Sequence, residues 1–265
     1  LDRIVTGKNY SNLISNSTFF PKTITYAPYT IGALHAVFSG SYGHKTGVNS
    51  YWSTPKFKKD EYKTLSLYLQ QNGYYTHADV INNLVLPKIG FDSFVVHDEE
   101  NDDLTARHKL LLDDMKNKSD ENKDFFLYLH YSNIHTGIMN EVLKKYDNFS
   151  EEYFSKKKEN EKFYDGLFKK ADVYLGDIIS YCEKLGLNEN SLIVVISDHG
   201  ISIGEKIGER AYGVYCYDYT LISTALFNHH SLPHKITENQ IRSIDLLPTI
   251  LDILSIPIDS DYKQI

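Results

Sequence analysis

The segment SLIVVISDHG, residues 191–200, joins an apolar run rich in β-branched residues to a polar end that carries Asp198 and His199. A short, continuous apolar run of this kind is typical of a strand that is buried on both faces of a parallel sheet. Gly200 allows the chain to turn sharply after the strand. A carboxylate oxygen beside an imidazole nitrogen suits Mn, Zn or Mg when other oxygens complete the ligand set, and suits Ca less. The segment predicts a buried strand that ends either in a simple turn or in a metal site.

Strand-like and helix-like segments alternate along the rest of the chain. Further apolar strands are expected at 74–81, 91–97, 125–131 and 221–227, and helices at 31–39, 60–71, 104–116, 151–185 and 241–254. Apolar strands separated by helices predict an α/β fold with a mostly parallel central sheet and helices on both faces. In such sheets functional groups gather beyond the carboxyl ends of the strands. Asp198 and residues 132–135 are expected there.

The composition limits the domain number and the kinds of partner. The chain has 265 residues, 42% of them hydrophobic, which is enough for one large core, so a single domain over residues 1–265 is expected. The net charge of −7 disfavours nucleic-acid binding. No apolar run approaches about 18 residues and no signal peptide is visible, so no membrane span is expected in this chain. The sequence does not determine the oligomeric state.

The cysteines and the first residue bear on the cellular location. Two cysteines, Cys182 and Cys216, do not make a disulfide framework, so both are expected as reduced thiols. Leu1 is not an initiator Met, so the chain is expected to begin inside a longer protein. The sequence leaves the location open between the cytoplasm and the cell envelope, the latter only if an upstream anchor or signal has been lost.

The segment TYAPYTIGALHAVFSG, residues 25–40, places Thr30 at the start of a helix-like run that ends at Gly40. A Thr at such a junction normally caps the helix with its side-chain oxygen. The same place attracts anions, because free N–H groups and the helix dipole favour negative charge. A hydroxyl there attacks a phosphate or sulfate ester if a metal lowers its pKa. The residues alone leave both roles open.

Two further segments carry candidate substrate-binding groups. His135 follows the expected strand 125–131 in a polar loop, where it is either an exposed loop residue or a group that binds an oxyanion or protonates a leaving group. Lys206 and Arg210 lie in GEKIGERAYG, residues 204–213, just past Asp198. They are either solvated charges or groups that hold a phosphate, for which Arg is well suited.

Together these pieces resemble the sulfatase-like branch of the alkaline phosphatase superfamily. The matching segments are LDRI (1–4), APYTIGALHAVFSGSYGHKTGVN (27–49), FFLYLHYSNIHTG (125–137), SLIVVISDHGISIGEK (191–206) and RSIDLLPTILDILSIP (242–257). They occur in the family's order and cover nearly the whole chain. The resemblance implies an alkaline phosphatase-like fold and a divalent metal cofactor.

The resemblance also assigns roles to single residues. Thr30 falls at the position of the nucleophile, which is also a metal ligand, and Asp198 and His199 fall at metal ligands. His135 falls at a substrate-facing catalytic His. Lys206, Arg210 and Tyr212 fall in the region that binds substrate.

The departures from the family pattern are informative. The resemblance implies the pattern Cys/Ser-x-Pro-x-Arg where this chain reads Thr30-Ile-Gly-Ala-Leu34. In sulfatases that Cys or Ser is oxidised to the aldehyde formylglycine, which Thr cannot give. Ser41 replaces an Arg, and Tyr212 stands where the family usually has a His. A Thr nucleophile resembles the phosphotransferase members instead. The family's first strand, with an acidic metal ligand, would precede Leu1, so the domain is expected to be N-terminally incomplete.

The sequence thus predicts a metal-dependent hydrolase or transferase that acts through Thr30 on a small-molecule, lipid or glycan ester. A phosphate ester is favoured over a sulfate ester. Two alternatives remain at this point. One is a catalytically degenerate domain that binds a glycan or an anionic ligand, and the other is a conventional sulfatase.

Overall fold

The computed structural model describes residues 7–260, so the segment 1–4 lies outside the described residues. Its strands are β1 (Thr18–Ile24), β2 (Tyr75–Val80), β3 (Ser93–Val96), β4 (Phe125–Leu129), β5 (Ile193–Ile196), β6 (Ile222–Asn228), β7 (Lys235–Ile236) and β8 (Ile241–Arg242). One sheet has the order β5-β6-β1-β7, with β8 also paired to β1, and the other has the order β3-β2-β4. The second sheet is entirely parallel, whereas β6 runs antiparallel to both β1 and β5.

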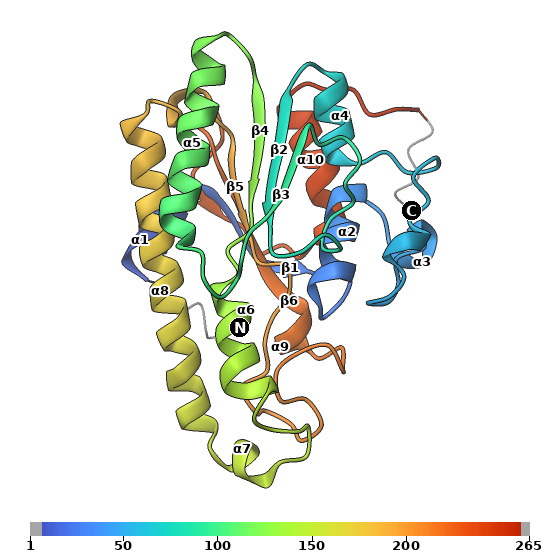
Figure 1. Ribbon diagram of the computed structural model, residues 1–265, viewed down its shortest axis with the longest axis vertical. Coiled ribbons are helices and arrows are strands. Elements are labelled where there is room, and N and C mark those ends of the chain that lie inside the picture. Colours follow the sequence, from blue (N-terminus) through green and yellow to red (C-terminus); the bar gives the residue numbers. More distant parts are fainter. Residues whose placement is uncertain (1–6, 261–265) are drawn as a thin grey trace.

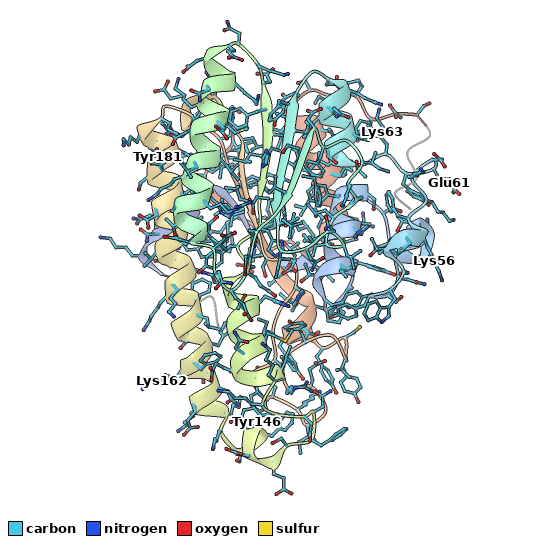
Figure 2. The ribbon with its side chains drawn as sticks, viewed as in Figure 1. Lys56, Glu61, Lys63, Tyr146, Lys162 and Tyr181 are labelled. Carbon is cyan, nitrogen blue, oxygen red and sulfur yellow. The ribbon has the colours of Figure 1, made fainter. Side chains whose placement is uncertain are left out.

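Helices cover the strands on both sides (Figure 1). One layer contains α1 (Lys8–Ser15), α5 (Leu104–Asp120) and α8 (Lys157–Lys184), and the opposite layer contains α2 (Thr30–Ser39), α4 (Leu65–Gln71) and α10 (Leu246–Ile253). The shorter helices are α3 (Gly43–Thr46), α6 (Asn133–Ile138), α7 (Glu151–Ser155) and α9 (Asp218–Leu221). Side chains fill the space between the layers, while the labelled Lys56, Glu61 and Lys162 point outward at the periphery (Figure 2).

Alternate side chains of one strand pack against opposite helix layers. Val194 and Ile196 of β5 pack into the core formed with α2, α4 and α10, whereas Val195 packs toward α1 and α8. Leu247 and Leu251 of α10 are completely buried in the first core. Burial of one such side chain stabilises the fold by roughly 1.5–3 kcal/mol. The predicted α/β class, with helices on both faces of the strands, is confirmed.

The two sheets meet at β4 and β5. Phe126 and Tyr128 of β4 pack into the same core as Val194 and Ile196 of β5. Within residues 7–260, however, β4 pairs only with β2, and β5 pairs only with β6. Each of these strands therefore has one edge whose backbone groups lack a strand partner in this part of the chain, and such groups are normally paired.

Several predicted helices have different bounds in the structure. The helix expected at 60–71 begins at Leu65, because the Thr64 side chain accepts a hydrogen bond from Leu67 N at 3.2 Å and caps the helix there. The helix expected at 151–185 is divided into α7 and α8 at Lys156. The helix expected at 241–254 is shortened, because strand β8 and the 3₁₀ turn Ser243–Asp245 precede α10.

Several elements were not expected from the sequence, and β1 and α6 are the most informative of them. Strand β1 contains Pro21, which normally argues against an inner strand. The pairing of β1 with β6 shifts register between Phe20 and Thr23, so a bulge accommodates the proline. The polar loop expected around His135 is helix α6, which continues into the π-helical segment Met139–Leu143.

The described residues contain no helix that is long and apolar enough to cross a membrane. Cys182 is buried and Cys216 is exposed, and both are free thiols, as expected.

Candidate active site

Thr30, Asp198 and His199 converge where α2 begins and β5 has ended. Thr30 Oγ1 lies 3.4 Å from His199 Nε2, which in turn lies 3.5 Å from Asp198 Oδ2. Of the two roles left open for Thr30, the structure does not support the cap, since the N-cap is Tyr29 in an extended conformation and Thr30 is the first helical residue. The Thr30 hydroxyl is therefore directed at the Asp-His pair.

A backbone carbonyl next to His199 determines which ring nitrogen carries the proton. His199 Nδ1 lies 2.8 Å from the Gly200 carbonyl oxygen, which can only accept, so Nδ1 carries the proton. The lone pair of a neutral ring is then on Nε2, on the side of Thr30 and Asp198. A ring whose far nitrogen donates to a carbonyl is the arrangement usual for a metal-ligating histidine.

Gly200 lets the chain turn directly after the pair. A Cβ atom at this position would lie 2.2 Å from the Tyr219 carbonyl oxygen, so no other residue fits without movement of the backbone. The Asp198 side chain accepts a hydrogen bond from His199 N at 2.9 Å, which ties the two candidate ligands into one turn.

Asp198 stays ionised in this environment. Burial opposes its ionisation, but the His199 and His130 side chains and the hydrogen bonds from Thr30 and His199 outweigh burial, so its pKa lies below the ordinary value. Burial lowers the pKa of His130 to about 4, although Asp198 partly opposes this effect. The site thus combines an ionised, partly exposed carboxylate with imidazole groups, which suits a cation.

Tyr212 connects this group to His135. Its hydroxyl lies 2.9 Å from His135 Nδ1, and its ring centroid lies 4.8 Å from that of His199. Burial raises the pKa of Tyr212, so the phenol remains neutral and can donate to His135. Burial lowers the pKa of His135 against the opposing effects of Glu99 and Asp198, and His135 Nε2 lies 4.0 Å from Glu99 Oε2. The structure thus brings five of the sequence-predicted site residues together.

Lys206 and Arg210 make other contacts. Lys206 Nζ lies 4.3 Å from the ring centroid of Tyr217. Arg210 donates from Nη1 to Asn148 Oδ1 at 2.7 Å and from Nη2 to the Leu143 carbonyl oxygen at 3.3 Å. These contacts hold the segment 204–213 in place, and the substrate role of both residues stays a prediction.

Three site neighbours were missed at the level of sequence. The rings of Tyr29 and Tyr51 stack with a centroid separation of 4.4 Å. The Tyr51 hydroxyl lies close to Gly213, the residue after Tyr212, since a Cβ atom on Gly213 would be only 3.0 Å from it. Burial raises the pKa of Tyr51 to about 12, with smaller contributions in the same direction from the charges of Tyr29, Asp198 and Glu209. Glu209 is completely buried, and its pKa is raised by burial. The sequence around these residues does not distinguish them, because a Tyr or Glu that is exposed to solvent can occur in the same local sequence.

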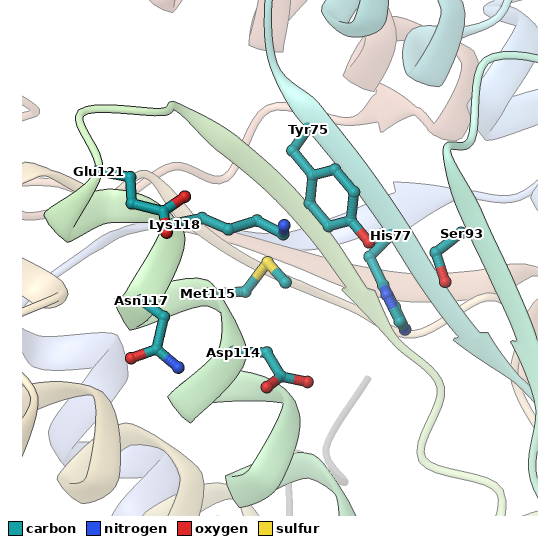
Figure 3. A pocket seen from close by; sticks show the side chains of 8 residues that line it. All are labelled: Tyr75, His77, Ser93, Asp114, Met115, Asn117, Lys118 and Glu121. Carbon is teal, nitrogen blue, oxygen red and sulfur yellow. The ribbon is translucent and has the colours of Figure 1, made fainter.

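A pocket elsewhere shares no residue with this site. It lies between the first halves of β2 and β3 and the last turns of α5, and is lined by residues that include Tyr75, His77, Asp114 and Lys118 (Figure 3). Tyr75 and His77 are at the start of β2, whereas functional groups in parallel sheets gather at the other end. We therefore assign the candidate active site to the Thr30 group.

Comparison with known proteins gives concordant results. The model of the family described as Sulfatase matches residues 3–256. The multifunctional alkaline phosphatase superfamily protein PehA from Trinickia caryophylli is 34% identical over 94 residues, which are 34% of this chain and 18% of PehA. The chain thus spans less than a fifth of that curated relative.

Solved structures share the fold over almost the whole chain. The putative sulfatase yidJ from Bacteroides fragilis has a TM-score of 0.75 at 16% identity and covers 98% of this chain and 71% of its own. The lipoteichoic acid synthase LtaP from Listeria monocytogenes has a TM-score of 0.73 at 15% identity, and the match covers 97% of this chain and 67% of LtaP. BT4656, solved with D-glucosamine-2-N,6-O-disulfate, has a TM-score of 0.68 at 17% identity and covers 96% and 72%. At these identities the likeness shows a shared fold.

Proposed function

The chain belongs to the sulfatase family, and within that family we propose that it cleaves a phosphate ester through Thr30. The observation that carries the proposal is the direction of the Thr30 hydroxyl, which lies 3.4 Å from His199 Nε2 and makes no capping bond to its helix. Phosphate is favoured over sulfate, because a Thr cannot be converted to the formylglycine on which sulfatases rely.

The donor set fits a divalent cation such as Mn, Zn or Mg. Asp198, His199 and Thr30 would hold it, since they offer an ionised carboxylate, an imidazole lone pair and a hydroxyl oxygen within hydrogen-bonding distance of one another. When bound, such a cation lowers the pKa of a hydroxyl and offsets charge on phosphate oxygens. The three donors leave the coordination incomplete.

We place the missing carboxylate on a segment outside residues 7–260. The free edges of β4 and β5, whose side chains share one core, support a strand between them. Asp198 follows β5, so an acidic residue at the end of an added strand would lie at the same edge of the sheet.

The reaction can be written from residues of this chain. Thr30 gives its hydroxyl proton to solvent, and a bond forms from Oγ1 to phosphorus while the bond from phosphorus to the leaving alcohol breaks. The leaving oxygen takes a proton from Nε2 of the imidazolium form of His135, in which Nδ1–H donates to the Tyr212 hydroxyl and so orients the ring. Water or an acceptor hydroxyl, whose proton passes to the now neutral His135, then attacks the phosphothreonine, and Thr30 leaves and regains its proton from solvent. The acceptor determines whether the outcome is hydrolysis or transfer.

What similar proteins make or bind supports a small-molecule, lipid or glycan ester as the substrate class. One of these proteins is a lipoteichoic acid synthase, and another was solved with a disulfated glucosamine. A second candidate function is binding of an anionic glycan without turnover. Ser41 in place of an Arg and Tyr212 in place of the family's usual His favour it, since both replacements remove groups expected in an active member of the family.

The two functions are separated by a turnover assay. We would use the protein with any residues that precede Leu1 in the encoded chain, supplied with Mn²⁺ or Zn²⁺, and offer aryl phosphodiesters, phosphomonoesters and sulfate esters. The proposal expects phosphate-ester turnover that Thr30→Val abolishes. Turnover of sulfate esters alone, or binding of sulfated glycans without any turnover, contradicts it.

A further inference from the structure

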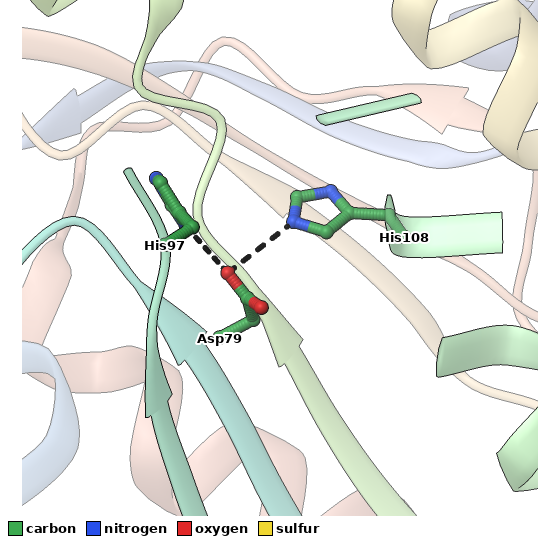
Figure 4. Close-up of side chains that lie close together, drawn as sticks. All are labelled: Asp79, His97 and His108. Carbon is green, nitrogen blue, oxygen red and sulfur yellow. Dashed lines mark hydrogen bonds and ion pairs between the residues drawn. The ribbon is translucent and has the colours of Figure 1, made fainter. Parts of the chain in front are cut away.

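A second group of titratable side chains is buried away from Thr30 (Figure 4). Asp79 is near the end of β2, His97 directly follows β3, and His108 is in the second turn of α5. Their exposed fractions are 0%, 3% and 0%. One ligand atom from each lies within 4.8 Å of the other two. None of the site residues predicted from the sequence belongs to this group.

The inner atoms of the three side chains converge on Asp79 Oδ1. His97 Nδ1 is hydrogen-bonded to this oxygen, and His108 Nε2 lies 3.6 Å from it. His108 Nε2 is buried and has no hydrogen-bond partner. A buried nitrogen left in this state costs about 1–3 kcal/mol, so a bound cation would relieve it.

The outer atoms are each held by a residue that does not reach the centre. The three bonds join Asp79 Oδ2 to Arg107 Nε at 2.6 Å, His97 Nε2 to Ser132 Oγ at 2.9 Å, and His108 Nδ1 to Tyr174 Oη at 2.6 Å. Metal-ligating histidines and carboxylates are usually oriented in this way by a partner on the far atom. The ligand set and its supports are therefore already arranged.

The local charge also suits a divalent ion. Arg107, which would otherwise repel a cation, also pairs through Nη1 with Asp102 Oδ2 at 3.5 Å. Two carboxylates and one guanidinium give this group a net charge of minus one when both histidines are neutral. A divalent cation would change this to plus one, which is a modest charge for a buried site.

We propose that Asp79, His97 and His108 form a second metal site, which takes Zn²⁺. Two imidazoles and one carboxylate are a set that Zn²⁺ accepts, at ligand distances of about 2.0–2.2 Å. The site would have a structural role. Ser132 is the N-cap of α6, but its hydroxyl is hydrogen-bonded to His97 and not to the helix backbone. The metal would thereby fix the helix that carries His135.

The test separates this site from the proposed catalytic one. In a chain carrying Asp198→Ala and His199→Ala, elemental analysis after incubation with Zn²⁺ and removal of free metal should give about one zinc per chain. Adding His108→Gln should weaken zinc binding by at least about tenfold. Adding His35→Gln is the matched control, since His35 is equally buried, bonds the Leu84 carbonyl oxygen and should leave the zinc content unchanged.

Two results overturn the proposal. One is absence of zinc from the folded Asp198→Ala, His199→Ala chain, and the other is full retention of zinc after His108→Gln. If the His108→Gln chain does not fold, Co²⁺ added to the parent chain decides the question. An intense visible absorption band from low-coordinate Co²⁺ supports the site, and its absence contradicts it.

Discussion

Thr30 Oγ1 and His199 Nε2 face each other across 3.4 Å, although 169 positions separate the two residues in the sequence. Thr30 begins α2, and His199 lies in the turn that follows β5. The fold thus brings a hydroxyl to a nitrogen lone pair at the carboxyl edge of the strands. This relationship makes the following expectations specific.

Replacement of Thr30 should separate chemistry from folding. Thr30→Val keeps the branched shape but removes the hydroxyl, so we expect loss of phosphate-ester turnover by at least about a thousandfold, as for removal of other nucleophiles. Because Thr30 makes no cap bond, the free energy of unfolding should change by less than about 1 kcal/mol. Steady-state kinetics and urea unfolding measure the two effects. Thr30→Ser should retain measurable turnover, and a Thr30→Ser chain as inactive as Thr30→Val contradicts the assignment.

Tyr212→Phe should lower kcat more than it changes KM. The variant keeps the ring beside His199 but removes the hydroxyl that holds His135 Nδ1 at 2.9 Å. We expect a loss of about 10²-fold in kcat, the lower range for a general acid. An unchanged kcat with an altered KM would show that Tyr212 only binds substrate.

Gly200→Ala should destabilise the fold and the site together. The new Cβ would lie 2.2 Å from the Tyr219 carbonyl oxygen, which is backbone and cannot turn aside. We expect a loss of about 2 kcal/mol or more in the free energy of unfolding, measured by urea titration. Gly166→Ala is the control, because Gly166 is inside α8 and a Cβ there meets nothing within 4 Å. That variant should be more stable by roughly 0.5–1 kcal/mol, and equal destabilisation of both variants contradicts the packing.

Stability should decrease as the pH falls from about 6.5 toward 4. Burial lowers the pKa of His35 to about 4, so between this value and about 6.5 the unfolded chain binds a proton that the folded chain does not. The contribution to stability is fully present above the unfolded pKa and is lost on acidification. His35→Gln should flatten the pH dependence of the unfolding free energy in this window by up to about 3 kcal/mol. The same slope in both chains would mean that other groups cause it.

The sequence was sufficient for the α/β class and for the places where the site residues lie. The apolar run before Asp198 and the helix that ends at Gly40 are local signals, and local signals predict elements well. The helix was expected from residue 31 but begins one residue earlier, at Thr30, because the N-cap is Tyr29, whose extended conformation depends on tertiary packing.

The remaining features depend on long-range contacts. Pro21 concealed β1, since a bulge that accommodates it cannot be seen in the sequence. Asp79, His97 and His108 belong to two strand ends and a helix, and each is unremarkable in its own segment. Only the parallel pairing of β2 with β3 and the packing of α5 bring them together.

Trapping the reaction on the protein tests the central claim most directly. We would mix the enzyme with a phosphodiester and divalent metal, stop the reaction within one turnover and locate added phosphate by mass spectrometry. The account predicts a phosphoester on Thr30 in the wild-type chain and none in Thr30→Val. Phosphate on another residue, or undiminished turnover by Thr30→Val, would contradict it.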